Sequence, residues 1–221
     1  MFIKVWLSLG SNLGDRLNYL NDARQALSLL SPNELEQSAI YESAPWGGVA
    51  KGTFLNQIIG IELSSNLLSS VLDHQIEKNF ISKYQLDSNL WLERLQFIES
   101  SPNNIKMLEQ LMLYLLLLEL KHGRNRKADA VRWDSRTLDL DILAIQPLEN
   151  PDQQFNSDIF CHYLSPYLEL PHPRLKERQF ILKPWFELVP QLYIPGLDAY
   201  LKDLLHDCPL DESLHVYSIS L

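Results

Sequence analysis

Two aspartates separated by one residue form a candidate metal-binding pair. Asp139 and Asp141 lie in the run TLDLDILAI at residues 137–145, whose pattern predicts a strand. Side chains two residues apart point to the same face of a strand, so both carboxylates share one face while Leu140 and Ile142 share the other. Such a pair can chelate a divalent metal, most naturally Mg²⁺ with phosphate oxygens completing its shell. A solvated sheet face with accidental spacing is an equal alternative, because D-x-D alone is a weak motif.

A run of basic residues leads directly into this pair. Six of the nineteen lysines and arginines fall within residues 121–136, namely Lys121, Arg124, Arg126, Lys127, Arg132 and Arg136. Guanidinium groups beside a metal-binding acidic pair suit a polyphosphate, which needs metal on some oxygens and cations on the others. A solvated charged loop is the alternative interpretation. Trp133 in the same loop either packs against the core or covers a bound nucleotide.

A second basic segment, PHPRLKER, contains His172, Arg174, Lys176 and Arg178. Alone it would indicate the start of an amphipathic helix with solvated charges. Together the two segments hold nine of the nineteen basic residues of a chain whose formal net charge is −9. This concentration predicts a local site for a polyanion.

A third group of residues suits a flat heterocycle. The Pro/Gly loop at residues 43–48 is followed by Phe54 and Asn56 in the strand-like run FLNQIIGIEL. A buried Asn needs hydrogen-bond partners. A bound ring would supply them and stack on Phe54, but an Asn bonded to a neighbouring loop fits the pattern equally well. Glu119, in a helix rich in leucine, fits an exposed stripe of that helix.

The elements that position these residues follow from hydrophobic periodicity and turn residues. Strands are expected at residues 2–9, 36–42, 54–63 and 137–145. Helices are expected at 17–30, within 64–104, from 103 or 104 to 121, and within 170–188, with an irregular segment at 147–169. Asp15 or Asn12 is expected to cap the first helix, and Asn103 or Asn104 the long helix that Gly123 ends. Strand, helix, strand, strand is the start of a split β-α-β arrangement.

Composition excludes several classes of protein. With 221 residues, 46% apolar and 21% charged, the chain is neither a disordered tail nor a small disulfide-stapled module, and it suits one large domain or a domain with an insertion. Twenty-eight acidic residues argue against nucleic-acid binding through a general field. Two cysteines outside any metal-ligand spacing predict a reduced, cytoplasmic protein. The apolar run at 111–120 is shorter than the roughly 20 residues that cross a bilayer, and residues 1–10 do not suit a signal peptide, so no membrane partner is expected.

Six ordered blocks of sequence resemble one enzyme family. They are LSLGSNLGDR, YESAPWGG, FLNQ, GRNRKA, RWDSRTLDLDIL and LPHPRLKERQFIL. In order and style they are similar to 6-hydroxymethyl-7,8-dihydropterin pyrophosphokinase of folate biosynthesis. The resemblance covers residues 1–63 and 117–190, and RTLDLDIL with an upstream RW is its most specific part. Composition and spacing alone indicate only metal-assisted polyphosphate chemistry.

The resemblance implies an α+β fold, a ferredoxin-like sandwich with an antiparallel sheet, helices packed on it and a helical insertion. It implies one pyrophosphokinase domain over residues 1–221, with the insertion at 64–104. Family members transfer the β,γ-diphosphate of ATP to the pterin hydroxymethyl group and release AMP, with two Mg²⁺ ions bridging the triphosphate and paired aspartates. The implied partners are these small molecules, without nucleic acid or membrane, and the implied assembly is a monomer or homodimer.

Site residues carry over from the family by position. Asp139 and Asp141 match the metal-binding aspartates, and together with Arg124 and Arg136 they form the expected catalytic set. The residues expected at ATP are Glu119, Arg126, Trp133, His172 and Arg178. Those expected at the pterin are Ser43, Trp46, Phe54, Asn56 and Phe180, with the two phenylalanine rings on opposite faces of the ligand.

Three features depart from the family pattern. Asp134 and Ser135 stand where members usually have Gly-Pro, the basic loop is longer, and residues 64–104 and 147–169 extend beyond short family members. Asp134 and the insertion support an alternative function, a non-catalytic pterin- or nucleotide-binding protein. A D-x-D glycosyltransferase is a third interpretation, but the chain lacks the dinucleotide-like β-α-β pattern that a nucleotide-sugar fold predicts.

Overall fold

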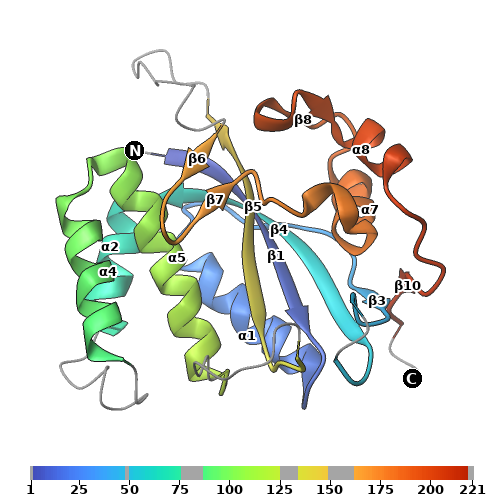
Figure 1. Cartoon of the computed structure of the whole chain (residues 1–221), viewed down its shortest axis with the longest axis horizontal. Coiled ribbons are helices and arrows are strands. Elements are labelled where there is room, and N and C mark those ends of the chain that lie inside the picture. Colours follow the sequence, from blue (N-terminus) through green and yellow to red (C-terminus); the bar gives the residue numbers. More distant parts are fainter. Residues whose placement is uncertain (1, 48–49, 76–86, 125–133, 149–161, 219–221) are drawn as a thin grey trace.

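The computed structural model describes residues 2–47, 50–75, 87–124, 134–148 and 162–218 (Figure 1). At its centre is an antiparallel sheet with strand order β10-β3-β4-β1-β5, and β2 pairs with β4 beside this path. Its strands are β1 (Phe2–Ser11), β2 (Glu36–Gln37), β3 (Tyr41–Ser43), β4 (Phe54–Ser64), β5 (Asp139–Pro147) and β10 (His215–Val216). Two short ribbons pair β6 (Tyr163–Leu164) with β7 (Glu169–Leu170), and β8 (Tyr193–Ile194) with β9 (Ala199–Tyr200).

Helices cover both faces of the sheet. One group lies on the left in Figure 1 and comprises α1 (Arg16–Ser28), α2 (Ser65–Gln75), α4 (Ser88–Ser100) and α5 (Asn103–Lys121). The other group lies on the right and comprises α7 (Gln179–Leu188) and α8 (Leu201–Asp207). A short 3₁₀ turn, Leu175–Glu177, precedes α7. The expected α+β class, with an antiparallel sheet and helices packed on it, is confirmed.

Strand β1 separates two hydrophobic cores. Its residues Ile3, Val5 and Leu7 are fully buried in the core shared with α1, α2 and α5. Trp6 points to the opposite face and meets Trp185 of α7, with ring centroids 5.6 Å apart. Because both faces of β1 are covered, most of its residues are apolar and form a nearly continuous run in the sequence.

Strand β5 presents the paired aspartates to the α7 side of the sheet. Leu140 and Ile142 are buried in the core with α5, so Asp139 and Asp141 face the other way. The predicted division of this strand into a carboxylate face and an apolar face is therefore confirmed. The result is a pair of carboxylates at the beginning of β5, close to its partner strand β1.

The segment expected to be one strand at residues 36–42 is two short strands. Both β2 and β3 pair with β4, but the pairing is interrupted at Ser38. The Ser38 hydroxyl accepts a hydrogen bond from Ile58 N at 3.0 Å, and its carbonyl accepts one from the Gln57 side chain at 2.8 Å. A serine side chain replaces part of the ladder here, which the alternation of residues did not reveal.

The helix boundaries are partly as predicted. Asp15 caps α1, its carboxylate accepting a hydrogen bond from Asn18 N at 3.2 Å. The prediction that Asn103 or Asn104 caps α5 is wrong, because the residue at the capping position is Pro102, which makes no side-chain hydrogen bond to the helix. Gly123, with φ of +83°, follows the end of α5 as expected, since a glycine takes this left-handed conformation without strain.

Helices α2 and α4 of the segment 64–104 share the core beneath the sheet. Leu68 and Leu72 of α2 and Ile98 of α4 are buried in the same cluster as Ile3 of β1. Both helices pack on α5. These two helices are therefore part of the core rather than attached to the outside of the protein.

Candidate active site

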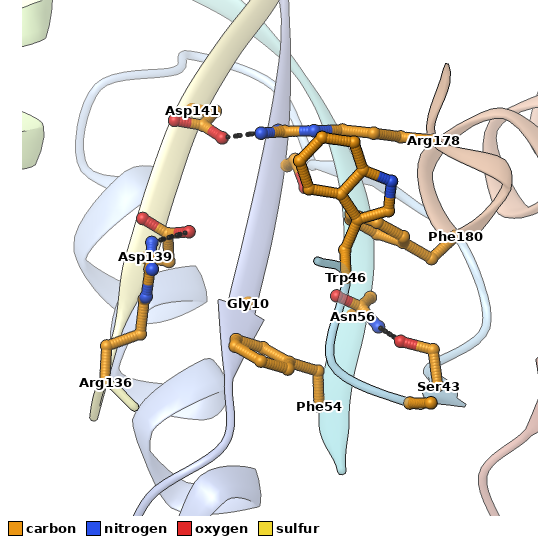
Figure 2. A pocket seen from close by; sticks show the side chains of 12 residues that line it. Gly10, Ser43, Trp46, Phe54, Asn56, Arg136, Asp139, Asp141, Arg178 and Phe180 are labelled. Atoms are coloured by element: carbon orange, nitrogen blue, oxygen red, sulfur yellow. Dashed lines mark hydrogen bonds and ion pairs between the residues drawn. The ribbon is translucent and has the colours of Figure 1, made fainter. Parts of the chain in front are cut away.

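A pocket opens on the α7 side of the sheet and contains most of the predicted site residues that the structure describes (Figure 2). It encloses about 550 Å³ with its open mouth included. Its lining residues come from β1, β3, β4, β5, the loop after β3, the turn before β5 and the start of α7. They are Ser8, Gly10, Ser43, Ala44, Trp46, Phe54, Asn56, Arg136, Asp139, Asp141, Arg178 and Phe180. Figure 2 shows charged residues on the β5 side and mainly aromatic residues on the β4 side.

Asp139 lies between two arginines from different segments. Arg136, three residues before it, donates from Nη1 to Oδ2 at 2.9 Å. Arg124, which follows α5, donates from Nη1 to Oδ1. Burial by itself lowers the pKa of the Arg124 guanidinium, but the carboxylates of Asp139 and Glu119 outweigh burial and raise that pKa. Arg124 is therefore a permanent cation next to Asp139.

Glu119 is the buried support of Arg124. Its side chain is 1% exposed, accepts a hydrogen bond from Leu140 N at 2.8 Å and pairs with Arg124. The interpretation of Glu119 as part of an exposed helical stripe is wrong, because the polar face of α5 at this point meets the beginning of β5. Glu119 does not line the pocket. It holds Arg124 toward Asp139, and its expected contact with ATP stays a prediction.

Asp141 faces a different pair of basic side chains. Arg178 donates from Nη1 to Oδ2 at 3.1 Å, and Nε2 of His172 lies 3.8 Å from the same oxygen. Burial lowers the pKa of the His172 imidazole below its ordinary value of 6.5, although the Asp141 carboxylate acts in the opposite direction. Histidine with a lowered pKa is neutral at pH 7, so Arg178 carries the positive charge opposite Asp141.

The other end of the pocket combines an amide with aromatic rings. Asn56 is 2% exposed, and its Nδ2 donates to the Ser43 hydroxyl at 2.9 Å. Phe54 and Phe180 line the pocket from β4 and from α7. The guanidinium carbon of Arg178 lies 5.6 Å from the Trp46 ring centroid and 5.8 Å from that of Phe180. Arg178 thus contacts both the charged and the aromatic end of the site.

Gly10 lies between the two ends. In the sheet it pairs with Asp139 on one side and with Asn56 on the other. A Cβ atom at this position would lie 3.7 Å from both Asn56 Oδ1 and Asp139 Cβ, and 3.8 Å from Phe54 Cδ1. The missing side chain therefore leaves open the space that connects the carboxylates to the aromatic rings.

Several residues of the site were not predicted from the sequence. Ser8, Gly10 and Ala44 line the pocket, and Asn12 lies beside it. The buried Asn12 side chain accepts from Arg136 N at 2.7 Å and donates to Lys51 O at 3.1 Å. Ser8, Gly10 and Asn12 belong to the block LSLGSN, which could have indicated them. Ser8 and Gly10 are two residues apart and share a strand face, as Asp139 and Asp141 do.

Other predicted residues cannot be placed in the site. Arg126 and Trp133, both expected at ATP, lie outside the described residues, as does Arg132. Asp134 is exposed, and its carboxylate accepts a hydrogen bond from Ser135 N at 2.7 Å. This local contact belongs to the turn that leads to Arg136, whose Nε donates to Asp134 O at 3.1 Å.

The fold and the pocket define a class of protein, an α+β protein in which a site with paired carboxylates and arginines adjoins a group of aromatic side chains. Comparison with protein families makes this class specific. The family model for 7,8-dihydro-6-hydroxymethylpterin-pyrophosphokinase matches residues 6–95 and 95–190. The chain belongs to this family, and its fold is the ferredoxin-like sandwich expected for it. It is therefore an enzyme that transfers the diphosphate of ATP to 6-hydroxymethyl-7,8-dihydropterin in folate biosynthesis.

Individual relatives are moderately similar over most of the chain. The 2-amino-4-hydroxy-6-hydroxymethyldihydropteridine pyrophosphokinase of Porphyromonas gingivalis is 26% identical over 86% of this chain and 92% of its own length. The protein of the same name from Mycobacterium bovis is 28% identical over 91% of this chain and 82% of its own. A solved Plasmodium falciparum HPPK-DHPS, crystallised with pterin and p-hydroxybenzoate, aligns with a TM-score of 0.48 and 11% identity. That alignment covers 93% of this chain and 43% of the Plasmodium chain.

Proposed function

We propose that the pocket of Figure 2 is the site of diphosphate transfer, with the pterin at its aromatic end and the triphosphate of ATP at its charged end. The observation that carries this proposal is the position of Gly10, which joins Asn56 to Asp139 across three neighbouring strands. The pterin hydroxymethyl oxygen forms a bond to the β-phosphorus and gives up its proton to water. The bond between the β-phosphorus and the oxygen that bridges it to the α-phosphorus breaks, and AMP leaves with that oxygen. A single open pocket lets both substrates meet without an intermediate carrier.

The pterin ring is held by stacking and by hydrogen bonds. Phe54 and Phe180 come from β4 and α7, so they suit the two faces of one flat ring. The Asn56 amide is buried and oriented by Ser43, which leaves its oxygen directed toward the space above Gly10. An oriented amide oxygen accepts hydrogen bonds from ring nitrogens that bear hydrogen. Trp46 covers the ligand from the loop after β3.

The charged end suits magnesium as well as phosphate. Asp139 and Asp141 offer carboxylate oxygens on one strand face, the ligand type that Mg²⁺ prefers. Within the described part of the chain, no group of three or more His, Cys, Asp or Glu is arranged to hold a metal. Ions at this pair would thus share their coordination with phosphate oxygens and water, and we infer two Mg²⁺ ions. The chemistry that they supply when bound is neutralisation of phosphate charge.

The arginines exchange partners when the substrates bind. Arg124, Arg136 and Arg178 are paired with the two aspartates in the structure. Once the carboxylates are ligands of a metal, these guanidinium groups become available to phosphate oxygens, which they bind in the same fork geometry. The protein therefore contributes position and charge, which are the main requirements of phosphoryl transfer. His172, neutral and near Asp141, can donate one hydrogen bond to a phosphate oxygen.

We also infer the domain organisation, the location in the cell and the assembly of the protein. The hydrophobic core that β1 shares with α2 and α4 supports one domain over residues 1–221, with the segment 64–104 as its helical insertion. Among the described helices, none is long and apolar enough to cross a membrane. The folate-pathway activity and the buried free thiol of Cys208 support a cytoplasmic protein, as a monomer or homodimer.

The proposed site is tested by product identity and metal dependence. Purified protein is mixed with ATP, Mg²⁺ and 6-hydroxymethyl-7,8-dihydropterin, and the nucleotides are separated by chromatography. AMP and the pterin diphosphate should appear in equal amounts, and removal of Mg²⁺ by a chelator should stop both. Formation of ADP would mean transfer of one phosphate and would contradict the proposal. Metal-dependent binding of both ligands without AMP would instead identify a non-catalytic binding protein.

A further inference from the structure

The C-terminal segment 211–217 contacts both sides of the pterin end of the pocket without lining it. Strand β10 pairs with β3 at the edge of the sheet, His215 opposite Glu42 and Val216 opposite Tyr41. Figure 1 shows the chain descending from α8 to this edge strand. The loop that carries Trp46 begins directly after β3. The last described part of the chain therefore lies against the element from which one side of the pocket extends.

Ser213 makes the contact with that side. Strand β3 ends at Ser43, and the next amide, Ala44 N, donates to the Ser213 hydroxyl at 2.8 Å. This hydroxyl in turn donates to Asp211 Oδ1 at 2.5 Å, so its direction is set. Ala44 itself lines the pocket, two residues before Trp46. The hydrogen bond from Ala44 N to Ser213 thus orients the backbone at the point where the pocket loop leaves the sheet.

Asp211 makes the contact with the opposite side. Its backbone N–H donates to Gln179 Oε1 at 2.7 Å. Gln179 is the first residue of α7 and stands between Arg178 and Phe180, which both line the pocket. The same turn is therefore hydrogen-bonded to the β3 side through Ser213 and to the α7 side through Asp211.

We propose that the turn Asp211–Ser213, here called the brace, sets the separation between the two sides of the pterin seat, with Ser213 and Gln179 as positioning residues. The proposal rests on the pterin seat proposed above. A ring stacked between Phe54 and Phe180 loses contact when the two sides move apart by a fraction of an ångström, because dispersion falls steeply with distance. The brace is hydrogen-bonded to Ala44 and to Gln179, and only through Arg178, the neighbour of Gln179, does it adjoin the charged end, so ATP should be affected much less than the pterin.

The test compares Ser213→Ala with Glu212→Ala in steady-state kinetics. Glu212 is exposed in the same turn and serves as the matched control. Ser213→Ala removes the acceptor of Ala44 N and should raise KM for the pterin about fivefold, with KM for ATP and kcat changed less than about twofold. Ser213→Thr keeps the hydroxyl and should restore the pterin KM. Gln179→Leu removes the other end of the brace and should have the same effect, and the double variant should be no worse than either single one.

Calorimetry separates failure of the brace from failure of the seat. The pterin is titrated into the full chain holding Mg²⁺ and the α,β-methylene analogue of ATP, with Phe54→Ala measured in parallel. If Phe54→Ala weakens the pterin while Ser213→Ala and Gln179→Leu match the Glu212→Ala control, the brace is wrong and the seat stands. If Phe54→Ala leaves pterin affinity unchanged, the seat and the brace are both wrong. Equal losses of pterin and ATP affinity with a lower Tm would indicate a purely structural role and would also overturn the brace.

Discussion

Arg178 at the start of α7 donates a hydrogen bond to Asp141 on β5 at 3.1 Å, across the open pocket. The two residues come from opposite sides of the site, and Arg178 also contacts the rings of Trp46 and Phe180. Asp141, a metal ligand in the proposed site, is thus neutralised by an arginine. In that proposal Mg²⁺ and ATP replace this ion pair, and the released Arg178 lies beside the proposed phosphate end of the pocket.

Replacing either paired aspartate should abolish transfer without unfolding the protein. In Asp139→Asn and Asp141→Asn the amide keeps the shape of the side chain but is a poor magnesium ligand. AMP formation should fall by several orders of magnitude, while the melting temperature stays close to that of the wild type. Asp134→Asn, on the same approach to β5 but exposed, is the control and should retain turnover. Substantial activity in either variant would show that the replaced aspartate is not an essential metal ligand.

The two phenylalanines of the pocket should matter for the pterin far more than for ATP. Phe54→Ala and Phe180→Ala each remove one stacking surface, which is worth about 1–3 kcal/mol for a base on an aromatic ring. Phe186→Ala changes a ring on the same helix as Phe180 that does not line the pocket. It should lower stability without selective loss of the pterin. Separate calorimetric titrations of the two ligands make the comparison, and equal losses for both would assign the phenylalanines to packing.

Gly10 and Gly60 should respond to the same substitution in opposite ways. The new Cβ in Gly10→Ala has its nearest neighbours at 3.7 Å, so the fold accepts it, but the methyl group occupies space that the pterin needs. Pterin affinity should drop at least about tenfold with an unchanged Tm. In Gly60→Ala the Cβ would lie 2.6 Å from Trp6 Cζ3. Such overpacking costs about 1–3 kcal/mol, so this variant should melt earlier. Thermal unfolding and pterin titration of both variants check these two predictions. A normal pterin affinity in Gly10→Ala would mean that the pterin does not occupy the space above Gly10.

Glu42 should make stability depend on pH in the acid range. Hydrogen bonds from Thr53 and from Arg16 lower the pKa of the Glu42 carboxyl below its ordinary value of 4.5. A lowered folded-state pKa gives stability that is complete above the unfolded-state value and is lost as pH falls through the folded-state value. Glu42→Gln should therefore be less stable by about 1 kcal/mol at pH 6 to 7, and the difference should shrink as pH falls below 4.5 and be lost below the lowered folded-state pKa. Urea unfolding from neutral to acid pH measures the difference in stability, and a difference that does not shrink on acidification would assign the effect to shape rather than charge.

Asp134 should oppose ATP binding through its charge. Its carboxylate is exposed beside the proposed phosphate end, and at ~8 Å with an effective dielectric of ~40 a unit charge repels another by about 1 kcal/mol. The nearby basic residues Arg126 and Arg132 lie outside the described residues, whereas the contact of Asp134 with Ser135 N belongs to the turn. Asp134→Asn keeps an acceptor for that contact and should tighten ATP about fivefold, less so at high salt. Asp134→Gly removes the contact as well. Weaker ATP binding by both variants would show that the carboxylate itself supports the site.

The sequence alone determined those features that depend on neighbours along the chain. The alternation of β5 placed Asp139 and Asp141 on one face, and Asp15 and Gly123 marked the ends of helices, because strand pleat and helix caps are local. The block order then pointed to the family, which the family comparison shows. Phe180 entered the predicted site only through that resemblance, whereas His172 also belonged to the basic segment PHPRLKER. Of these two, the structure places Phe180 in the pocket and His172 beside Asp141.

Only the tertiary structure decided which distant residues meet. It paired Gly10 with both Asp139 and Asn56, because strand register depends on how three separate segments pack. It turned Glu119 inward, since a charge on a leucine-rich helix is buried when a partner such as Arg124 neutralises it. It also joined Ser213 to Ala44, residues 169 positions apart, through a backbone amide left without a strand partner. No local pattern encodes such contacts, because they satisfy polar groups that become buried only when the chain has folded.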